Sequence, residues 1–232
     1  MTKVITPSKA RSTNGDIATP KPTSVQISAP RISTACFTIK GTSPLVIHRI
    51  DKKVEESFHN KIVSGSTPKG KTKFEPRDPD EICEAAKYIG ETNGVRWEGF
   101  NASGIRCALI SACRLVNFKM TLAKLSLFVV EDGRDIYSPS YPLVRIIGKS
   151  VKNEMIGRTE TGVAMLVIRP MYWPWSAKLR IRFDAGQFSL TDVSNLLCRA
   201  GLQVGICEGR NDSKNSNGMG WGAFEIINEE LE

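Results

Sequence analysis

The chain has 232 residues, of which 41% are hydrophobic, and its formal net charge is +8. This length permits one large domain or a core with a sizeable insertion. The positive charge predicts an acidic partner, most often a nucleic acid. No apolar run approaches the ~20 residues of a membrane-spanning helix and no signal peptide is recognisable, so we expect a cytoplasmic protein without a membrane partner.

The six cysteines favour the same compartment. None forms a Cys-x-x-Cys pair, which argues against a structural zinc site. Most lie in apolar stretches, where reduced thiols pack as small hydrophobic side chains. The sequence therefore predicts no metal and no cofactor.

The first part of the chain predicts a tail followed by a strand. Residues 1–30 are rich in Ser, Thr, Pro and Lys and lack periodicity, which predicts a disordered basic tail. The remaining residues, 31–232, are predicted to form a single domain. Alternating apolar and polar residues predict a strand over Ile32–Lys40, and a turn, Gly41–Leu45, leads into a short apolar run.

The middle of the chain predicts an inserted loop and two helices. Residues 51–79 are polar and are predicted to be a flexible loop with a cluster of lysines. Residues 80–89 are predicted to form a helix behind an aspartate cap. The clearest helical pattern is 101–116, where apolar residues recur on one face. Asn101 or Ser103 can cap this helix.

The second half predicts mostly strands. Residues 122–130, 143–147, 163–169 and 178–183 have strand-like patterns, and the last of these alternates cationic with apolar side chains. Residues 148–162, between the second and third of these strands, are polar and predict a second insertion. This insertion is a candidate for a hairpin that grips a nucleic-acid strand.

The last elements are a helix and a strand. Ser189 and Asp192 have the spacing of a capping box that opens a helix to Arg199, with Gly201 as its C-cap glycine. A strand follows at 223–227. The order strand, helix, strand, strand, helix, strand predicts an α+β protein with a ferredoxin-like, RNA-recognition-motif (RRM)-like core, basic loop insertions and a glycine-rich C-terminal loop.

The segment 205–224 is the most distinctive part of the sequence. Its glycines permit positive φ and close backbone approach, and successive backbone N–H groups in such a loop can bind an anion. Arg210 and Lys214 add positive charge. Trp221 is the best candidate for stacking on a base, whereas Trp173 and Trp175 fit a core or an interface between protomers. The alternative is that the glycines only turn the chain.

Three signals occur in one order: a strand followed by Gly41-Thr-Ser-Pro-Leu45, a helix opened by Asn101-Ala-Ser-Gly-Ile-Arg106, and the glycine-rich loop before a last strand. In this order they resemble the RAMP superfamily, RRM-fold proteins that include backbone, crRNA-processing and cap subunits of CRISPR effector complexes. The sequence departs from the family pattern where Phe100-Asn-Ala replaces the usual Pro-Gly and where Cys207 replaces a loop glycine.

The resemblance implies a site. Ser103 and Arg106 would contact phosphate at the start of a helix, and the glycine-rich loop would pack against that helix and the RNA backbone. The alternative for Ser103 is a simple N-cap. The candidate nucleic-acid-binding residues are Lys69, Lys71, Lys73, Ser103, Arg106, Lys149, Lys152, Arg158, Gly205, Gly209, Arg210, Lys214, Gly218, Gly220, Trp221 and Gly222.

Three functions remain open. The first is a non-catalytic subunit that binds single-stranded nucleic acid, RNA favoured over DNA, beside copies of itself and other effector subunits. The second is a metal-independent RNA endonuclease in which His48 acts as general base, the role that a histidine in the first part of the chain has in RNA-processing RAMP proteins. The third is a phage or plasmid protein that binds single-stranded DNA or mimics an effector subunit. The default is the first, without catalysis.

Overall fold

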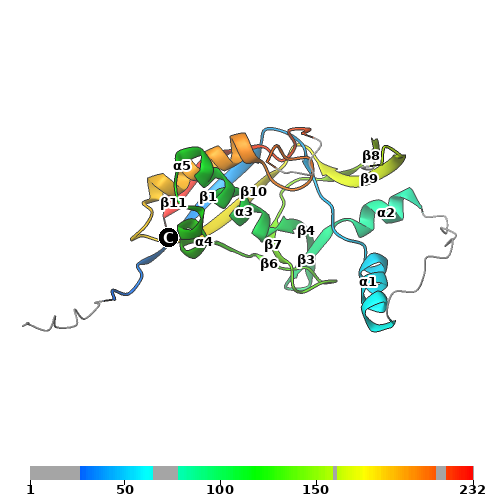
Figure 1. The fold of residues 1–232 in the computed structure, drawn as a ribbon, viewed down its shortest axis with the longest axis horizontal. Helices are drawn as coiled ribbons and strands as arrows, with labels where there is room; N and C mark the ends of the chain where they lie inside the picture. The colour runs from blue at the N-terminus through cyan, green and yellow to red at the C-terminus, as the bar shows by residue number, and fades with distance from the viewer. Residues whose placement is uncertain (1–26, 65–77, 159–160, 213–217, 232) are drawn as a thin grey trace, which may run out of the picture.

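The computed structural model describes residues 27–64, 78–158, 161–212 and 218–231. Within these ranges the protein is α+β: three antiparallel sheets are combined with α-helices, as Figure 1 shows. No described helix has the length and apolar character that a membrane crossing requires. Most of the predicted tail lies outside the described residues.

The main sheet has four strands in the order β11–β1–β10–β5, and every neighbouring pair is antiparallel. Its strands are β1 (Ile32–Gly41), β5 (Leu127–Val130), β10 (Ser176–Asp184) and β11 (Phe224–Leu231). The first and last strands of the chain are therefore neighbours. The predicted strands at 32–40, 178–183 and 223–227 are all present.

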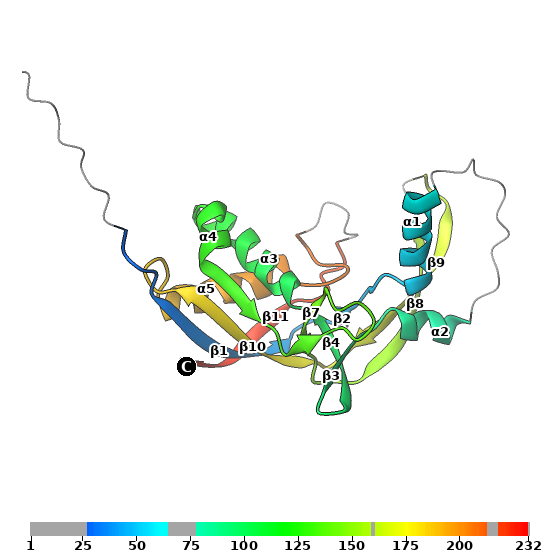
Figure 2. The same cartoon turned by 90° about the horizontal axis from the view of Figure 1, so that it is seen from below.

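Helices α3 (Ala102–Ala112) and α5 (Leu190–Arg199) cover one face of this sheet, as Figure 2 shows. Alternate residues of the strands point to opposite faces. On β1 and β10 the buried residues beneath the helices are apolar, whereas Lys178 and Arg182 are exposed on the other face. The core residues that these two strands supply include Ala35, Phe37, Ile39, Leu179, Ile181 and Phe183.

Two smaller sheets extend the molecule. One has the order β3–β4–β7–β6, formed by β3 (Tyr88–Thr92), β4 (Val95–Asn101), β7 (Pro142–Arg145) and β6 (Gly133–Arg134). The other has the order β2–β9–β8, formed by β2 (Leu45–Val46), β9 (Ala164–Tyr172) and β8 (Ser150–Arg158). The β8–β9 hairpin projects from the main sheet, and α1 and α2 lie at the same end of the molecule (Figure 1, Figure 2).

Both predicted insertions contain regular structure: this corrects the flexible loop predicted at 51–79, whereas a hairpin was expected at the second insertion. Residues 52–64 of the predicted loop form α1 (Lys52–Ser64), a helix rich in lysine and glutamate, which are good helix formers. Residues 150–158 of the second insertion form β8, which pairs with β9 along its whole length. The part of the first insertion that includes Lys69, Lys71 and Lys73 lies outside the described residues.

Two other elements also differ from the sequence prediction. The helix predicted over 80–89 ends early, as α2 (Pro79–Ala85), and gives way to β3. Most of the strand predicted over 122–130 is helix α4 (Met120–Ser126), in which Ala123 and Ser126 share a buried face. The reason is that its Met, Leu, Ala and Lys residues favour a helix.

Gly201 does not end a helix. A 3₁₀ turn (Cys113–Val116) follows α3, and a π-helical turn (Ala200–Val204) follows α5, so the chain stays helical beyond Gly201 until Gly205, whose φ is 74°. A side chain at Gly201 would collide with the backbone of Phe224 on β11. Gly201 therefore permits close packing of helix on strand, and Gly205 supplies the left-handed turn.

Candidate functional site

Two of the three sequence motifs, the start of α3 and the glycine-rich loop, line one cavity, which we call the glycine-loop cavity. Its volume is about 460 Å³, and it lies between the start of α3, the segment after β2 and the first part of the glycine-rich loop. Residues far apart in the sequence meet there. Its lining comprises Ile47, His48, Tyr88, Asn101, Ser103, Gly104, Cys107, Ala108, Ser111, Val204, Ile206, Cys207, Glu208, Arg210 and Asp212.

The start of α3 forms one wall of the cavity. Asn101 is the N-cap, and its side-chain oxygen accepts a hydrogen bond of 2.9 Å from the backbone N–H of Ser103. Ser103 is therefore not the cap; it is an exposed residue of the first helical turn. The positive end of the helix dipole faces this region, which favours a negatively charged ligand.

The turn Gly41–Leu45 holds the end of the glycine-rich loop. The Ser43 hydroxyl accepts a hydrogen bond of 2.9 Å from the backbone N–H of Ala223, and the Ala223 carbonyl accepts one of the same length from the N–H of Thr42. The N–H of Gly222 donates to the Pro44 carbonyl at 2.8 Å. Two of the three sequence motifs are thus hydrogen-bonded to each other.

The backbone conformation of the loop explains why glycine occurs at these positions. All five candidate glycines, Gly205, Gly209, Gly218, Gly220 and Gly222, have positive φ. A side chain at Gly222 would also collide with the backbone of Ile206, and one at Gly209 would collide with the Trp221 ring. The Trp221 ring is partly buried and covers Gly209, so it contributes to the packing of the loop.

Arg210 and Asp212, which line the cavity, are both held by hydrogen bonds within the protein. The Arg210 guanidinium donates to the carbonyl oxygens of Cys207 (3.0 Å) and Asp212 (3.2 Å), which fixes the turn that carries it. The Asp212 carboxylate accepts a hydrogen bond of 2.6 Å from Arg114. This bond is the main reason that the pKa of Asp212 lies below its usual value. The loop is therefore fastened to the end of α3 by an ion pair.

His48 lies at the mouth of the same cavity. Its Nδ1 is 3.4 Å from a guanidinium nitrogen of Arg169 and 3.8 Å from a carboxylate oxygen of Glu208, and Arg169 donates to Glu208 at 2.9 Å. Burial and the charge of Arg169 lower the pKa of His48 below 6.5, against the opposite effect of Glu208. His48 is therefore neutral at pH 7 and can accept a proton.

Arg106 follows Ser103 by one helical turn but does not line the cavity. Its guanidinium donates to the carbonyl oxygens of Leu127, the first residue of β5, and of Lys124 in α4, and it lies 5.3 Å from the centre of the Phe128 ring. Arg182 approaches the same ring at 5.5 Å. Arg106 therefore ties α3 to the edge of the main sheet.

The predicted hairpin cations are also apart from the cavity. Lys149, Lys152 and Arg158 lie on or beside β8, in the projecting hairpin. Lys152 forms ion pairs with Asp80 (2.6 Å) and with Glu154 (3.3 Å). Of the loop residues, Lys214 lies outside the described ranges. Of the described candidate residues, Ser103 and Arg210 line the cavity, while Arg106 and the hairpin cations lie apart from it.

Sequence reasoning missed three residues that line the cavity, Tyr88, Glu208 and Asp212, and it missed Arg169, which donates to Glu208. Tyr88 was assigned to a helix, although the Tyr-Ile pair at 88 and 89 favours a strand. The two carboxylates lie beside Arg210 in the glycine-rich loop, and only the fold shows that arginines from β9 and from the end of α3 reach them.

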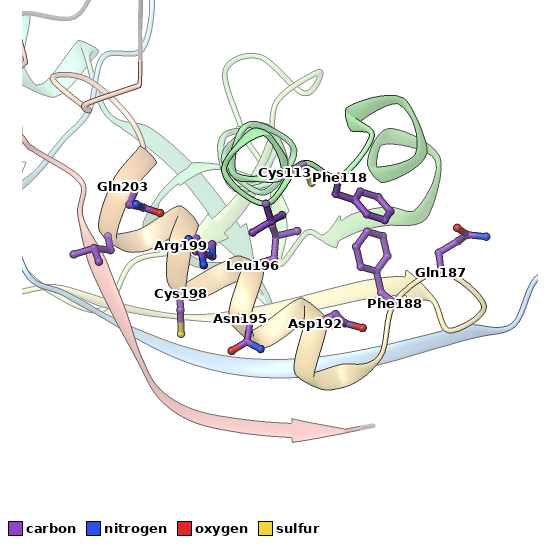
Figure 3. Close-up of a pocket in the computed structure, with 12 residues that line it drawn as sticks. Cys113, Phe118, Gln187, Phe188, Asp192, Asn195, Leu196, Cys198, Arg199 and Gln203 are labelled. Carbon is purple, nitrogen blue, oxygen red and sulfur yellow. The ribbon is translucent and has the colours of Figure 1, made fainter.

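A second cavity, of about 760 Å³, lies between the end of α3 and α5, as Figure 3 shows. Phe118 and Phe188 lie side by side at its end, with ring centres 4.9 Å apart and ring planes tilted by 47°. None of the predicted site residues lines it. Among the described residues, no three His, Cys, Asp or Glu side chains are grouped as ligands for a metal ion.

No protein-family model and no curated protein matches the chain. Among solved structures, it is similar to a chain of the type III-B Cmr-beta complex bound to cognate target RNA, with 12% sequence identity and a TM-score of 0.39. The similarity covers 87% of this chain and 61% of that chain, so this protein spans less than two thirds of that chain's length. The similarity is too distant to identify a family or a function.

Proposed function

We propose that this protein is a non-catalytic subunit that binds single-stranded RNA at the glycine-loop cavity, within a CRISPR-type ribonucleoprotein. The observation that carries the proposal is that the start of α3 and the glycine-rich loop line one cavity, while the turn Gly41–Leu45 is hydrogen-bonded to the end of that loop. A helix N-terminus and Arg210 lie there, and both favour a phosphate.

The topology supports the same proposal. The main sheet has the strand order β11–β1–β10–β5, and its chain order is β1, α3, β5, β10, α5, β11. A βαββαβ unit with the fourth strand beside the first and the third between the first and second is the ferredoxin-like arrangement that RRM-like proteins use. The further partners in this proposal are copies of the chain and other effector subunits, and the projecting β8–β9 hairpin is an element that can reach them.

The test is the binding of a labelled single-stranded RNA, measured by fluorescence anisotropy over a range of salt concentrations. We expect affinity to fall steeply with salt, because each phosphate contact releases counterions. Arg210→Gln should weaken binding and reduce the salt slope. Arg134→Gln is the matched control, since Arg134 pairs with Glu131 away from the cavity. Affinity that is independent of salt, or equal in both variants, would contradict the proposal.

A second candidate function is RNA cleavage with His48 as general base. The specific observation in its favour is that neutral His48 lies in the same cavity as Ser103 and Arg210. Such a base would deprotonate a 2′-hydroxyl, while Arg169 beside it would stabilise the charge that develops on phosphate. His48→Ala should then abolish cleavage and leave binding intact. Absence of cleavage by the wild type, or cleavage unaffected by the change, would exclude this role.

A further inference from the structure

Tyr88 is the aromatic side chain that the structure places in the glycine-loop cavity. It lies at the start of β3 and is partly buried against the core. The Tyr141 ring meets it edge to face, with ring centres 5.5 Å apart and planes at 61°. Tyr88 is therefore held by its neighbours, and a fixed aromatic ring loses little freedom when a flat group stacks on it.

The deep part of the cavity is apolar. It is lined by buried aliphatic side chains, each at most 3% exposed: Ile47, Ala108, Val204 and Ile206. A pocket that joins buried aliphatic side chains to one aromatic ring suits a flat, largely apolar group such as a nucleobase. The volume of about 460 Å³ is within the range of small-molecule sites.

The charge of the cavity limits the ligand. Arg169 and Arg114, from outside the cavity lining, form ion pairs with the lining carboxylates of Glu208 and Asp212. The Arg210 guanidinium donates to backbone carbonyl oxygens, so its positive charge is in surplus. Burial raises the pKa of Tyr88 to about 12, so its phenol stays uncharged. One surplus charge matches the single negative charge of a phosphodiester and disfavours a triphosphate.

We infer that the glycine-loop cavity binds one nucleotide unit of the RNA strand, with its base stacked on Tyr88 and its phosphodiester beside Arg210 and the start of α3. The inference rests on the proposed function and specifies it. Tyr88, and not Trp221, is then the residue that contacts the base. Trp221 packs against Gly209 within the loop.

The experiment compares Tyr88→Leu, Tyr88→Phe and wild type on RNA with 2-aminopurine at successive positions. In the wild type, stacking should quench the 2-aminopurine fluorescence at one position. Tyr88→Leu should abolish the quench and weaken binding about 5- to 150-fold, while Tyr88→Phe keeps both. Tyr137→Leu is the control, because Tyr137 is exposed and lines a different cavity.

Two results separate the proposals. If wild-type protein shows no salt-dependent RNA binding, the proposed function fails and this inference fails with it. If wild type and Tyr88→Leu bind equally and show the same quench, only the inference is overturned. Should Tyr88→Leu not fold, photocrosslinking of wild type to RNA that contains 5-iodouridine decides the question: attachment at Tyr88 supports the inference, and attachment only elsewhere overturns it.

Discussion

The hydroxyl of Ser43 and the backbone N–H of Ala223 are joined by a hydrogen bond of 2.9 Å across 180 residues of sequence. The same turn holds the Trp175 ring, whose Nε1 donates to the Ser43 carbonyl at 2.8 Å. One short turn after β1 thereby fixes both the end of the glycine-rich loop and a buried aromatic ring. The shape of the candidate site depends on this junction.

Ser43→Ala should therefore destabilise the protein modestly and loosen the loop. It removes the acceptor of the Ala223 N–H, and the loss of such a bond costs about 1 kcal/mol. Chemical denaturation measures the change. Thr42→Ala is the control, because the Thr42 side chain is exposed and its backbone bond to Ala223 is kept. Equal stability of Ser43→Ala and wild type would show that the bond does not hold the loop.

Gly222→Ala should destabilise the protein much more than Gly220→Ala. Both residues have positive φ, 70° and 72°, so both changes carry the strain of a left-handed backbone, about 1 kcal/mol. Only at Gly222 would the new methyl group collide with the backbone of Ile206; at Gly220 its nearest neighbour is 3.7 Å away. Thermal unfolding of the two variants gives the comparison, and equal melting temperatures would contradict the predicted collision.

Arg49→Met should be severely destabilising. Arg49 and Asp135 form an ion pair of 3.0 Å whose side chains are 3% and 0% exposed. Removing the arginine leaves a buried carboxylate without its counterion, which costs about 3–5 kcal/mol. The matched control is Arg96→Met, because Arg96 pairs with Glu91 at 3.6 Å on the surface. That variant should stay within about 0.5 kcal/mol of wild type in urea denaturation.

The pKa of His48 should depend on the neighbouring charge of Arg169. We expect an NMR midpoint below 6.5, which rises in Arg169→Gln because the charge of Arg169 no longer opposes the imidazolium. The unfolded chain binds this proton more readily than the folded one, so His48 contributes stability that is lost as the pH falls below 6.5. A midpoint at or above 6.5 in wild type would contradict the lowered pKa that the surroundings of His48 predict.

Local patterns predicted several elements well, because those elements depend on neighbouring residues. The capping box at Ser189 and Asp192 is confirmed, with both reciprocal hydrogen bonds present. The alternation of apolar and polar residues in β1 and β10 also predicted which face of the main sheet is apolar and which is polar. Helix α1 was missed because its apolar side chains are exposed: Phe58 is 55% and Ile62 is 83% exposed, so no buried stripe marks the helix in the sequence.

The candidate site was predicted only in part. The start of α3 was identified from the family resemblance and Arg210 from the composition of the loop, and both line the cavity. The partners of His48 could not be identified, because Arg169 follows it by 121 residues and reaches it only through the pairing of β2 with β9. Arg106 has the spacing of a phosphate ligand, yet its helical position directs it to the carbonyl groups beside β5.

The central position of β1 has a consequence for synthesis. β1 pairs with β10 and β11, and the turn after it binds the residues that precede β11. These contacts therefore cannot form until more than half of the described chain has been synthesised. Contacts of such long range are slow to form. A nascent chain that ends before β11 leaves one edge of β1 unpaired and the ring of Trp175 without Phe224. Such an intermediate is prone to aggregate and would benefit from a chaperone until its last strand is added.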